Sequence, residues 1–140
     1  MLKPSLTTPL TQLITRWRHW WRQQTPNRQD RFAFIAPLAA VVLFHDWQPR
    51  ARTLQCSMAA DTPLWASRYA LRGLLAYAFI TAGASKLWTA MPHTSERAIR
   101  FNLGIGMRRE AVLRHHFGPK VHAVICSMLR DEWARSRWRK

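Results

Sequence analysis

The residues of this sequence best suited to hold a metal are its histidines and its two cysteines. His122 and Cys126 are four positions apart and would share one face of a helix, and His115 and His116 precede them. Imidazole nitrogens and a thiolate form a donor set that zinc accepts. The spacing matches no common zinc motif, and Cys56 has no partner nearby. We therefore predict no metal site.

Nucleophilic catalysis by a cysteine is the second chemistry that these residues allow. Either cysteine could pair with a histidine, and the many arginines would lower the pKa of a nearby thiol. Such a pair also needs an acid that orients the histidine, and no acid lies at a recognisable spacing. The adjacent carboxylates of Asp131 and Glu132 lie among arginines and are better suited to ion pairs. We therefore predict no catalytic residue.

A glycine-containing segment around Gly104 and Gly106 is the remaining candidate for a ligand site. It lacks the third glycine and the preceding apolar strand of a dinucleotide-binding motif, and no Gly-Lys-Ser/Thr phosphate loop is present. A break between two helices explains these glycines better. The sequence thus predicts no cofactor and a protein that is not an enzyme.

Composition indicates a partner of negative charge. The chain has 140 residues, enough for one domain, and 48% of them are apolar, which permits a core. Its 22 Lys and Arg against 7 Asp and Glu give a formal charge of +15. Two cysteines are too few for a disulfide-rich secreted module. A surface this basic attracts phosphate backbones or anionic lipid headgroups.

The N-terminal region, residues 1–31, is predicted to be a basic amphipathic arm. Leucines and tryptophans recur at helical spacing over about residues 10–24 with arginines between them, and Pro26 ends the pattern. A helix with a Trp/Leu stripe and an Arg face is typical of a membrane interface. An ordinary basic helix packed on its own domain fits the same pattern, so both interpretations stay open.

Two short apolar segments follow the arm. Residues 32–48 begin with 13 uncharged residues, and 65–93, predicted to form a second apolar helix, contain another 13. Crossing a bilayer takes about 20 residues, so each segment is either a short membrane-inserted element or a buried helix. Residues 49–64 show no periodicity and predict a linker.

The C-terminal region, residues 94–140, is basic and is predicted to be helical. Thr94 or Ser95 can cap a helix that has Glu96 in its first turn. The Gly-Pro pair at 118–119 separates two helices, and the apolar residues within 121–129 follow a helical period. The sequence therefore predicts an all-α fold of four or five short helices, one or two of them inserted in a membrane.

Two groups of side chains are predicted to make the contacts with partners. Tryptophans and arginines that flank the apolar segments are expected at a membrane interface: Arg16, Trp17, Arg18, Trp20, Trp21, Arg22, Arg28, Arg31, Trp47, Trp65 and Trp88. A second, C-terminal group could neutralise phosphates and stack on bases if the partner is a nucleic acid: Arg130, Trp133, Arg135, Arg137, Trp138, Arg139 and Lys140.

Residues 16–44 are similar to one known family. They resemble the N-terminal membrane entry of proteobacterial sensor histidine kinases with PAS domains, through Trp20-Trp21-Arg22, Pro26, Arg28-Gln29-Asp30-Arg31-Phe32 and Ala36-Pro37-Leu38. The resemblance implies an inner-membrane anchor with a cytoplasmic N-terminus and a link to signal transduction. It ends at His45-Asp46, and no phosphoacceptor or ATP-binding motif follows.

These observations predict a small, basic, non-enzymatic protein of the bacterial inner membrane. Its partners would be anionic lipids, and it would be a truncated or frameshifted N-terminus of a sensor kinase. Two alternatives stay open. One is an Arg/Trp-rich nucleic-acid-binding protein whose affinity falls steeply with salt. The other is an unselected reading frame beyond residue 44 with no function.

Overall fold

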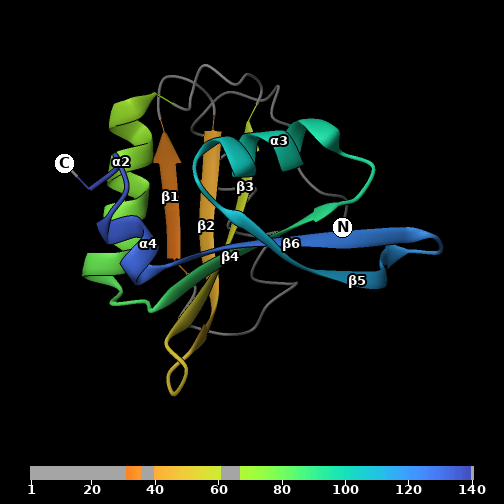
Figure 1. The fold of residues 1–140 in the computed structure, drawn as a ribbon, viewed down its shortest axis with the longest axis horizontal. Coiled ribbons are helices and arrows are strands. Elements are labelled where there is room, and N and C mark those ends of the chain that lie inside the picture. Colours follow the sequence, from red (N-terminus) through yellow and green to blue (C-terminus); the bar gives the residue numbers. More distant parts are fainter. Residues whose placement is uncertain (1–30, 36–39, 61–66, 140) are drawn as a thin grey trace.

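The computed structural model describes residues 31–35, 40–60 and 67–139, and the side chains of 42–58 and 67–139. These residues form one six-stranded sheet with helices beside it (Figure 1). In chain order the elements are β1 (Arg31–Ile35), β2 (Ala40–Gln48), β3 (Thr53–Ala60), α2 (Arg68–Ala76), the π-helical η2 (Tyr77–Thr81), β4 (Lys86–Pro92), α3 (Glu96–Gly104), β5 (Arg108–Gly118), β6 (Val121–Leu129) and α4 (Arg130–Ala134).

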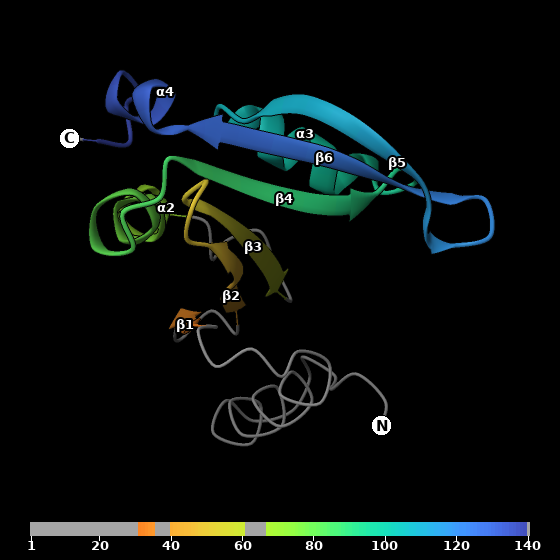
Figure 2. The same cartoon turned by 90° about the horizontal axis from the view of Figure 1, so that it is seen from below.

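The strands follow one another across the sheet in the order β1-β2-β3-β4-β6-β5 (Figure 2). All neighbouring pairs are antiparallel except β3 and β4, which are parallel. The ladder between β4 and β6 is the most regular of the central pairs and extends from Lys86↔Leu129 to Pro92↔Ala123. The parallel pair is therefore the place where two antiparallel halves of the sheet are joined.

The predicted all-α fold is wrong, because the structure is mixed α/β. The apolar stripe within 121–129, which matches a helical period, forms strand β6. Its residues Ala123 to Met128 are buried in succession, so both faces of β6 are covered. A strand buried on both faces is a continuous apolar run, and such a run contains the helical spacing as well as the strand spacing.

The two apolar segments belong to the core of the domain. Within the first, Val42 and Phe44 on β2 are 0% and 2% exposed. The second, predicted to be one helix, contains α2 and η2, and its residues from Lys86 to Pro92 form strand β4. Among the described residues, no helix is long and apolar enough to cross a membrane. The prediction of membrane-inserted helices is wrong, because these segments pack inside the domain. The sequence does not distinguish the two cases, since the core of a domain and a lipid bilayer both favour apolar residues.

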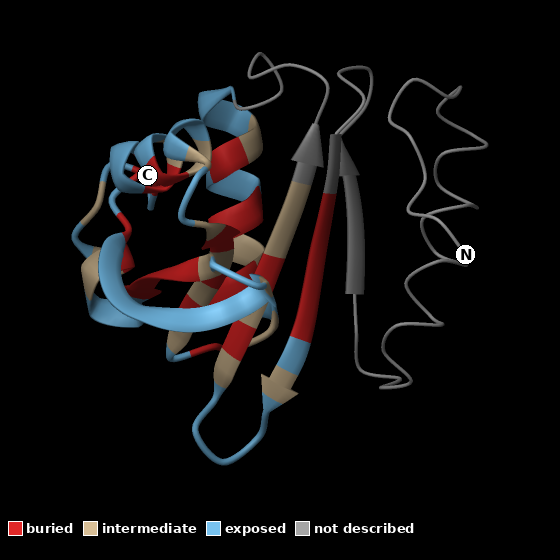
Figure 3. Ribbon diagram, turned by 90° about the vertical axis from the view of Figure 1, so that its right-hand side faces the viewer, coloured by how far each residue is buried: buried red, intermediate tan, exposed pale blue. Residues whose placement is uncertain are grey.

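Helix α2 is amphipathic and packs against the sheet. Its N-cap is Ser67, whose hydroxyl oxygen accepts a hydrogen bond from the backbone N–H of Ala70 at 3.1 Å. Leu71, Leu74 and Leu75 face the core, and Figure 3 shows buried residues in α2 and in the strands next to it. The same hydrophobic cluster includes residues of α3, β4 and β6, so both long helices are held on one core.

The C-terminal segment after β6 closes this core. Trp133 of α4 is 4% exposed and stacks on Phe79 of η2, with ring centroids 5.3 Å apart. Arg130 donates a hydrogen bond to the carbonyl oxygen of Phe79. Trp138 is 7% exposed, and its Nε1 donates to the carbonyl oxygen of Ile105 at 2.7 Å. The segment is thus tied to both η2 and the end of α3.

Candidate functional site

The candidate site lies where β3 and β4 separate. Their ladder has three pairs, from Thr53↔Lys86 to Gln55↔Trp88, yet β3 continues to Ala60 and β4 to Pro92. Figure 1 shows β3 and β4 pointing in different directions beyond the paired part. Among the described strands, none pairs with β3 on its β4 side after Gln55. Backbone N–H and C=O groups need partners, so these edges can bind an extended ligand that carries amides.

A helix start lies at the same end of the parallel pair. Helix α2 connects β3 to β4, so its N-terminus is at the end toward which both strands run. Its first turns carry Arg68 and Arg72, both exposed, and its first turn contains no acid. Free backbone N–H groups, the helix dipole and two arginines together favour a bound phosphate or another anion.

A buried histidine lies next to the separating strands. His45 of β2 is 7% exposed, and its Nε2 lies 2.8 Å from the hydroxyl oxygen of Ser57 on β3. Ser57 is two residues past Gln55, the last residue of β3 that pairs with β4. The register pairs His45 with Gln55, so both residues and Ser57 lie on the face of the sheet opposite Phe44. An imidazole can act as a proton acceptor, and this one lies on the strand next to β3, in contact with Ser57 of β3.

A buried polar contact fixes Thr89, the first residue of β4 beyond its ladder with β3. The Thr89 hydroxyl donates to Oδ1 of Asn102 on α3 at 3.2 Å, and both residues are almost fully buried. The Asn102 amide nitrogen donates to the carbonyl oxygen of Ala98 at 2.8 Å. Because buried polar groups are costly when unpaired, this contact sets how α3 lies against β4 beside the separation.

Both cysteines are buried thiols in this structure. Cys56 is the first residue of β3 beyond the ladder with β4, and burial raises its pKa to about 12. Burial also raises the pKa of Cys126, although Arg109 opposes the shift. A thiolate is the nucleophilic form of cysteine, so neither side chain is prepared to accept an acyl group near neutral pH.

We expect both thiols to be unreactive in the native protein. Dithionitrobenzoate at pH 8 should label neither cysteine within the time that labels both after unfolding in guanidinium chloride, because the raised pKa values and burial remove accessible thiolate. The measurement is the amount of chromophore released per protein molecule before and after unfolding. Rapid labelling of one cysteine in the native protein would contradict the buried-thiol assignment.

Of the positions considered for zinc, the structure brings His115 and His122 together but does not join Cys126 to them. His122 and Cys126 lie on strand β6 rather than on a helix, and Cys126 is fully buried. The Nδ1 atoms of His115 and His122 each accept a backbone hydrogen bond. In the ranges that the structure describes, no group of three or more His, Cys, Asp or Glu side chains is placed to hold a metal ion.

The residues predicted for a membrane interface do not form one group. Arg16, Trp17, Arg18, Trp20, Trp21, Arg22, Arg28 and Trp65 lie outside the described residues, and Arg31 begins β1. Trp47 and Trp88 are half-buried on β2 and β4, and Trp47 packs against the core.

The C-terminal residues predicted for nucleic acid are divided between core and surface. Trp133 and Trp138 are buried, so their rings are not available for stacking on bases. Arg135 and Arg139 are exposed, and Arg137 lies over the Trp138 ring at 4.5 Å. Lys140 lies outside the described residues. No finding tests the predicted contacts of the arginines and of Lys140, which stay a prediction.

Two residues of the candidate site are missed by the sequence patterns. His45 falls at the end of an apolar segment, and Ser57 falls within the predicted linker. Alternation of polar and apolar residues from Thr53 to Met58 is a signal that could have located Ser57 on a strand. No such signal exists for His45, because residues 38–44 before it are apolar without interruption. His45 and Ser57 come together through the pairing of β2 with β3, and no local sequence pattern predicts that pairing.

Comparisons with known proteins support the fold. No protein-family model and no curated protein matches this sequence. Among solved structures, a protein of T. thermophilus named as an acetyltransferase has a TM-score of 0.67 at 22% identity, covering 86% of this chain and 69% of its own. A point mutant of spermidine N-acetyltransferase SpeG from Vibrio cholerae has a TM-score of 0.67 at 12% identity, covering 96% and 85%. A SpeG chimera from Vibrio cholerae and hSSAT has a TM-score of 0.69 at 12% identity, covering 95% and 86%.

These likenesses correct the functional predictions from the sequence. The resemblance to sensor histidine kinases is wrong, and with it the truncated signalling protein, the inner-membrane location and the anionic-lipid partner. The nucleic-acid-binding alternative and the prediction of a non-enzymatic protein are also contradicted. Matches over 86% to 96% of the chain include the residues after Phe44, so an unselected reading frame is contradicted too. In its described residues the chain has the fold of the GNAT acetyltransferases.

Proposed function

We propose that this protein transfers the acetyl group of acetyl-CoA to an amine of a small molecule. The observation that carries the proposal is the separation of the parallel strands β3 and β4, with the basic start of α2 at the end toward which they open. The fold supports the same reaction, since solved structures that share it are named acetyltransferases.

The residues at the separation fit the parts of acetyl-CoA. The pantetheine arm carries amides, which can hydrogen-bond to the unpaired edges of β3 beyond Gln55 and of β4 beyond Trp88. The phosphates fit the N-terminus of α2, where Arg68 and Arg72 add positive charge. Residues 61–66, which join β3 to α2, contain no glycine, so the chain does not use a glycine-rich phosphate loop there.

Acetyl-CoA supplies an acetyl thioester, and the protein has to deliver a neutral amine to it. The amine nitrogen bonds to the carbonyl carbon, the carbon–sulfur bond breaks, CoA leaves as its thiol, and the amine loses a proton. His45 is the group proposed to accept that proton, because its imidazole is buried beside Ser57 just past the last β3–β4 pair. Transfer is direct, because both cysteines are buried thiols.

Binding of acetyl-CoA tests the proposal. Calorimetry of the purified protein should give a saturable, one-to-one isotherm, and Arg68→Gln combined with Arg72→Gln should raise Kd about tenfold, as expected for lost charge-assisted contacts. The matched control combines Arg50→Gln and Arg109→Gln, two exposed arginines in the β2–β3 turn and on β5. The proposal fails if the unmodified protein does not bind acetyl-CoA.

A further inference from the structure

Three histidines form a chain of hydrogen bonds at the end of β4. The N–H of His122 donates to Nδ1 of His93, the N–H of His115 donates to Nδ1 of His122, and the N–H of Lys120 donates to Nδ1 of His115, each at 2.9 Å. The ring centroids of His93 and His122 are 4.9 Å apart, and those of His115 and His122 are 5.1 Å apart. We call these three residues the histidine cluster.

The hydrogen bonds determine which ring nitrogen carries the proton. A nitrogen that accepts an N–H bond is unprotonated, so the neutral rings of His115 and His122 carry their proton on Nε2. Nδ1 of His93 lies 3.3 Å from the carbonyl oxygen of His122 as well as 2.9 Å from its backbone nitrogen, and the shorter contact favours the same tautomer there. Burial and the charges of His93, His115 and Arg114 lower the pKa of His122, which favours the neutral form. No described residue provides an acceptor for these Nε2–H groups. The cluster therefore presents donors to its surroundings.

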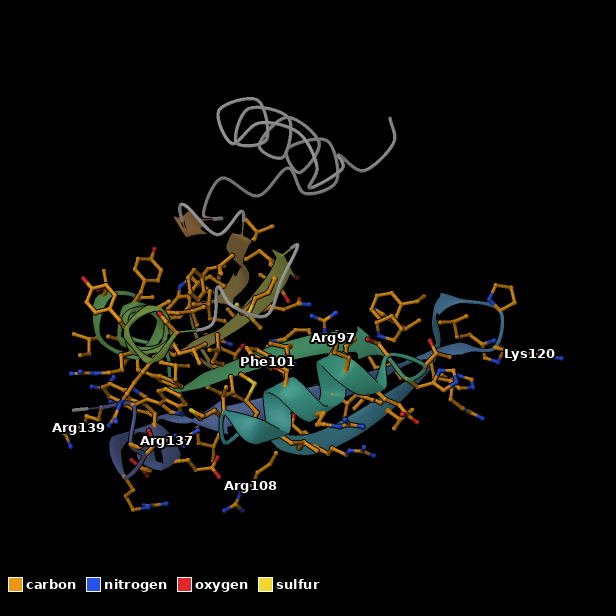
Figure 4. The ribbon with its side chains drawn as sticks, turned by 90° about the horizontal axis from the view of Figure 1, so that it is seen from above. Arg97, Phe101, Arg108, Lys120, Arg137 and Arg139 are labelled. Carbon is orange, nitrogen blue, oxygen red and sulfur yellow. The ribbon has the colours of Figure 1, made fainter. Side chains whose placement is uncertain are left out.

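The charges around the histidine cluster are positive. Arg114 precedes His115 on β5, and Lys120 lies in the turn between β5 and β6, where Figure 4 shows its side chain at the tip of the hairpin. In the described ranges, the ion pairs are Lys86 with Glu110 and Arg108 with Glu132, so neither involves Arg114 or Lys120. A group of donors and cations that is joined to no carboxylate is complementary to a ligand with several anionic oxygens.

The cluster lies at the open end of the separated strands. His93 directly follows Pro92, the last residue of β4, and its backbone N–H donates to the carbonyl oxygen of His122 at 2.8 Å. The parallel strands separate toward this end of β4. Figures 1 and 2 both place the β5–β6 hairpin and helix α2 on opposite sides of the molecule. The cluster is thus distant from the proposed phosphate site at the start of α2.

We propose that the histidine cluster, with Arg114 and Lys120, binds a carboxylate or phosphate of the molecule that receives the acetyl group. The inference rests on the proposed function and adds a substrate class to it: an amine that also carries an anionic group. A polycation such as spermidine, the substrate that the name of SpeG gives for that protein, would be repelled by Arg114 and Lys120.

Ligand titrations followed by NMR test the site without any enzymatic activity. The probes are inorganic phosphate, glutarate and spermidine, added separately to the full chain while the imidazole resonances are recorded. Phosphate and glutarate should shift the signals of His93, His115 and His122, and spermidine should not. Arg114→Gln combined with Lys120→Gln should weaken phosphate binding about tenfold. The matched control is His116→Gln, since that ring packs on Phe117 and is outside the hydrogen-bonded chain.

Calorimetry with acetyl-CoA distinguishes an anionic group of the acetyl acceptor from a phosphate of CoA as the group that the cluster binds. If the site serves the acceptor, the Arg114/Lys120 double variant binds acetyl-CoA with unchanged Kd. Weaker acetyl-CoA binding with unchanged phosphate and glutarate shifts would overturn the proposal, because the cluster would then hold a phosphate of CoA. Absence of any shift with both anions also overturns it. Failure of the unmodified protein to bind acetyl-CoA, with anion binding intact, would instead count against the proposed function.

Discussion

Replacing His45 with Gln is expected to lower kcat for acetyl transfer about 100-fold, in the range typical of a lost general base. Glutamine has a side-chain amide that can hydrogen-bond to the Ser57 hydroxyl, which lies 2.8 Å from Nε2 of His45. It cannot accept the proton of the amine, so the loss should appear in kcat, while Kd for acetyl-CoA stays the same. Steady-state kinetics and calorimetry on the same preparation make the measurement.

The pH profile separates a base from a structural role. The measurement is kcat at saturating amine, because kcat/KM also falls toward acid pH through protonation of the free amine. In the unmodified protein kcat should fall toward acid pH, and His45→Gln should flatten that limb, since the proton acceptor is gone. His116→Gln is the control, because it also removes an imidazole but lies on exposed β5. A variant with reduced activity and an unchanged acid limb would show that His45 only supports the local structure.

Replacing Trp138 with Ala is expected to lower the free energy of unfolding by about 3 to 5 kcal/mol. The indole is 7% exposed and its Nε1 donates to the carbonyl oxygen of Ile105 at 2.7 Å. The substitution removes a large buried side chain and leaves a buried carbonyl oxygen without its donor. Denaturant unfolding followed by circular dichroism makes the measurement.

Two further variants identify what the indole contributes. Trp138→Phe retains most of the packing and loses the hydrogen bond, so its cost should be about 1 to 3 kcal/mol. Arg139→Ala, at an exposed neighbouring position, should change stability by less than about 0.5 kcal/mol. If Trp138→Ala instead left stability unchanged, the C-terminal segment would not be part of the core.

Some local features could be predicted because they depend on neighbours in the chain. A helix predicted to begin after Thr94 or Ser95 is present: α3 starts at Glu96 and ends at Gly104, although the Ser95 side chain makes no capping hydrogen bond. Much of the apolar segment 73–85 is helical in α2 and η2. Glycines and short-range periodicity act on residues a few positions away, so the start and end of a helix can be predicted from the local sequence.

The candidate site could not be predicted, because it depends on contacts between distant residues. His45 and Ser57 meet only when β2 pairs with β3, and the separation of β3 from β4 exists only once β4 pairs with β6. The histidine cluster joins His93 to His122, which are 29 positions apart. Side chains such as these have no recognisable spacing in the chain, and a motif search passes over them.

The sequence by itself determined that the chain is basic, has enough apolar residues for a core and has too few cysteines for a disulfide-rich module, because these properties are sums over composition. Only the tertiary structure decided what its apolar segments become. The same run of residues can be buried in lipid, in a helix or in a two-sided strand, and local periodicity does not separate these outcomes. In this protein β6 is buried by the elements on its two faces, and Trp133 and Trp138 are buried against the helices. These tertiary contacts determined which structure each apolar segment adopts.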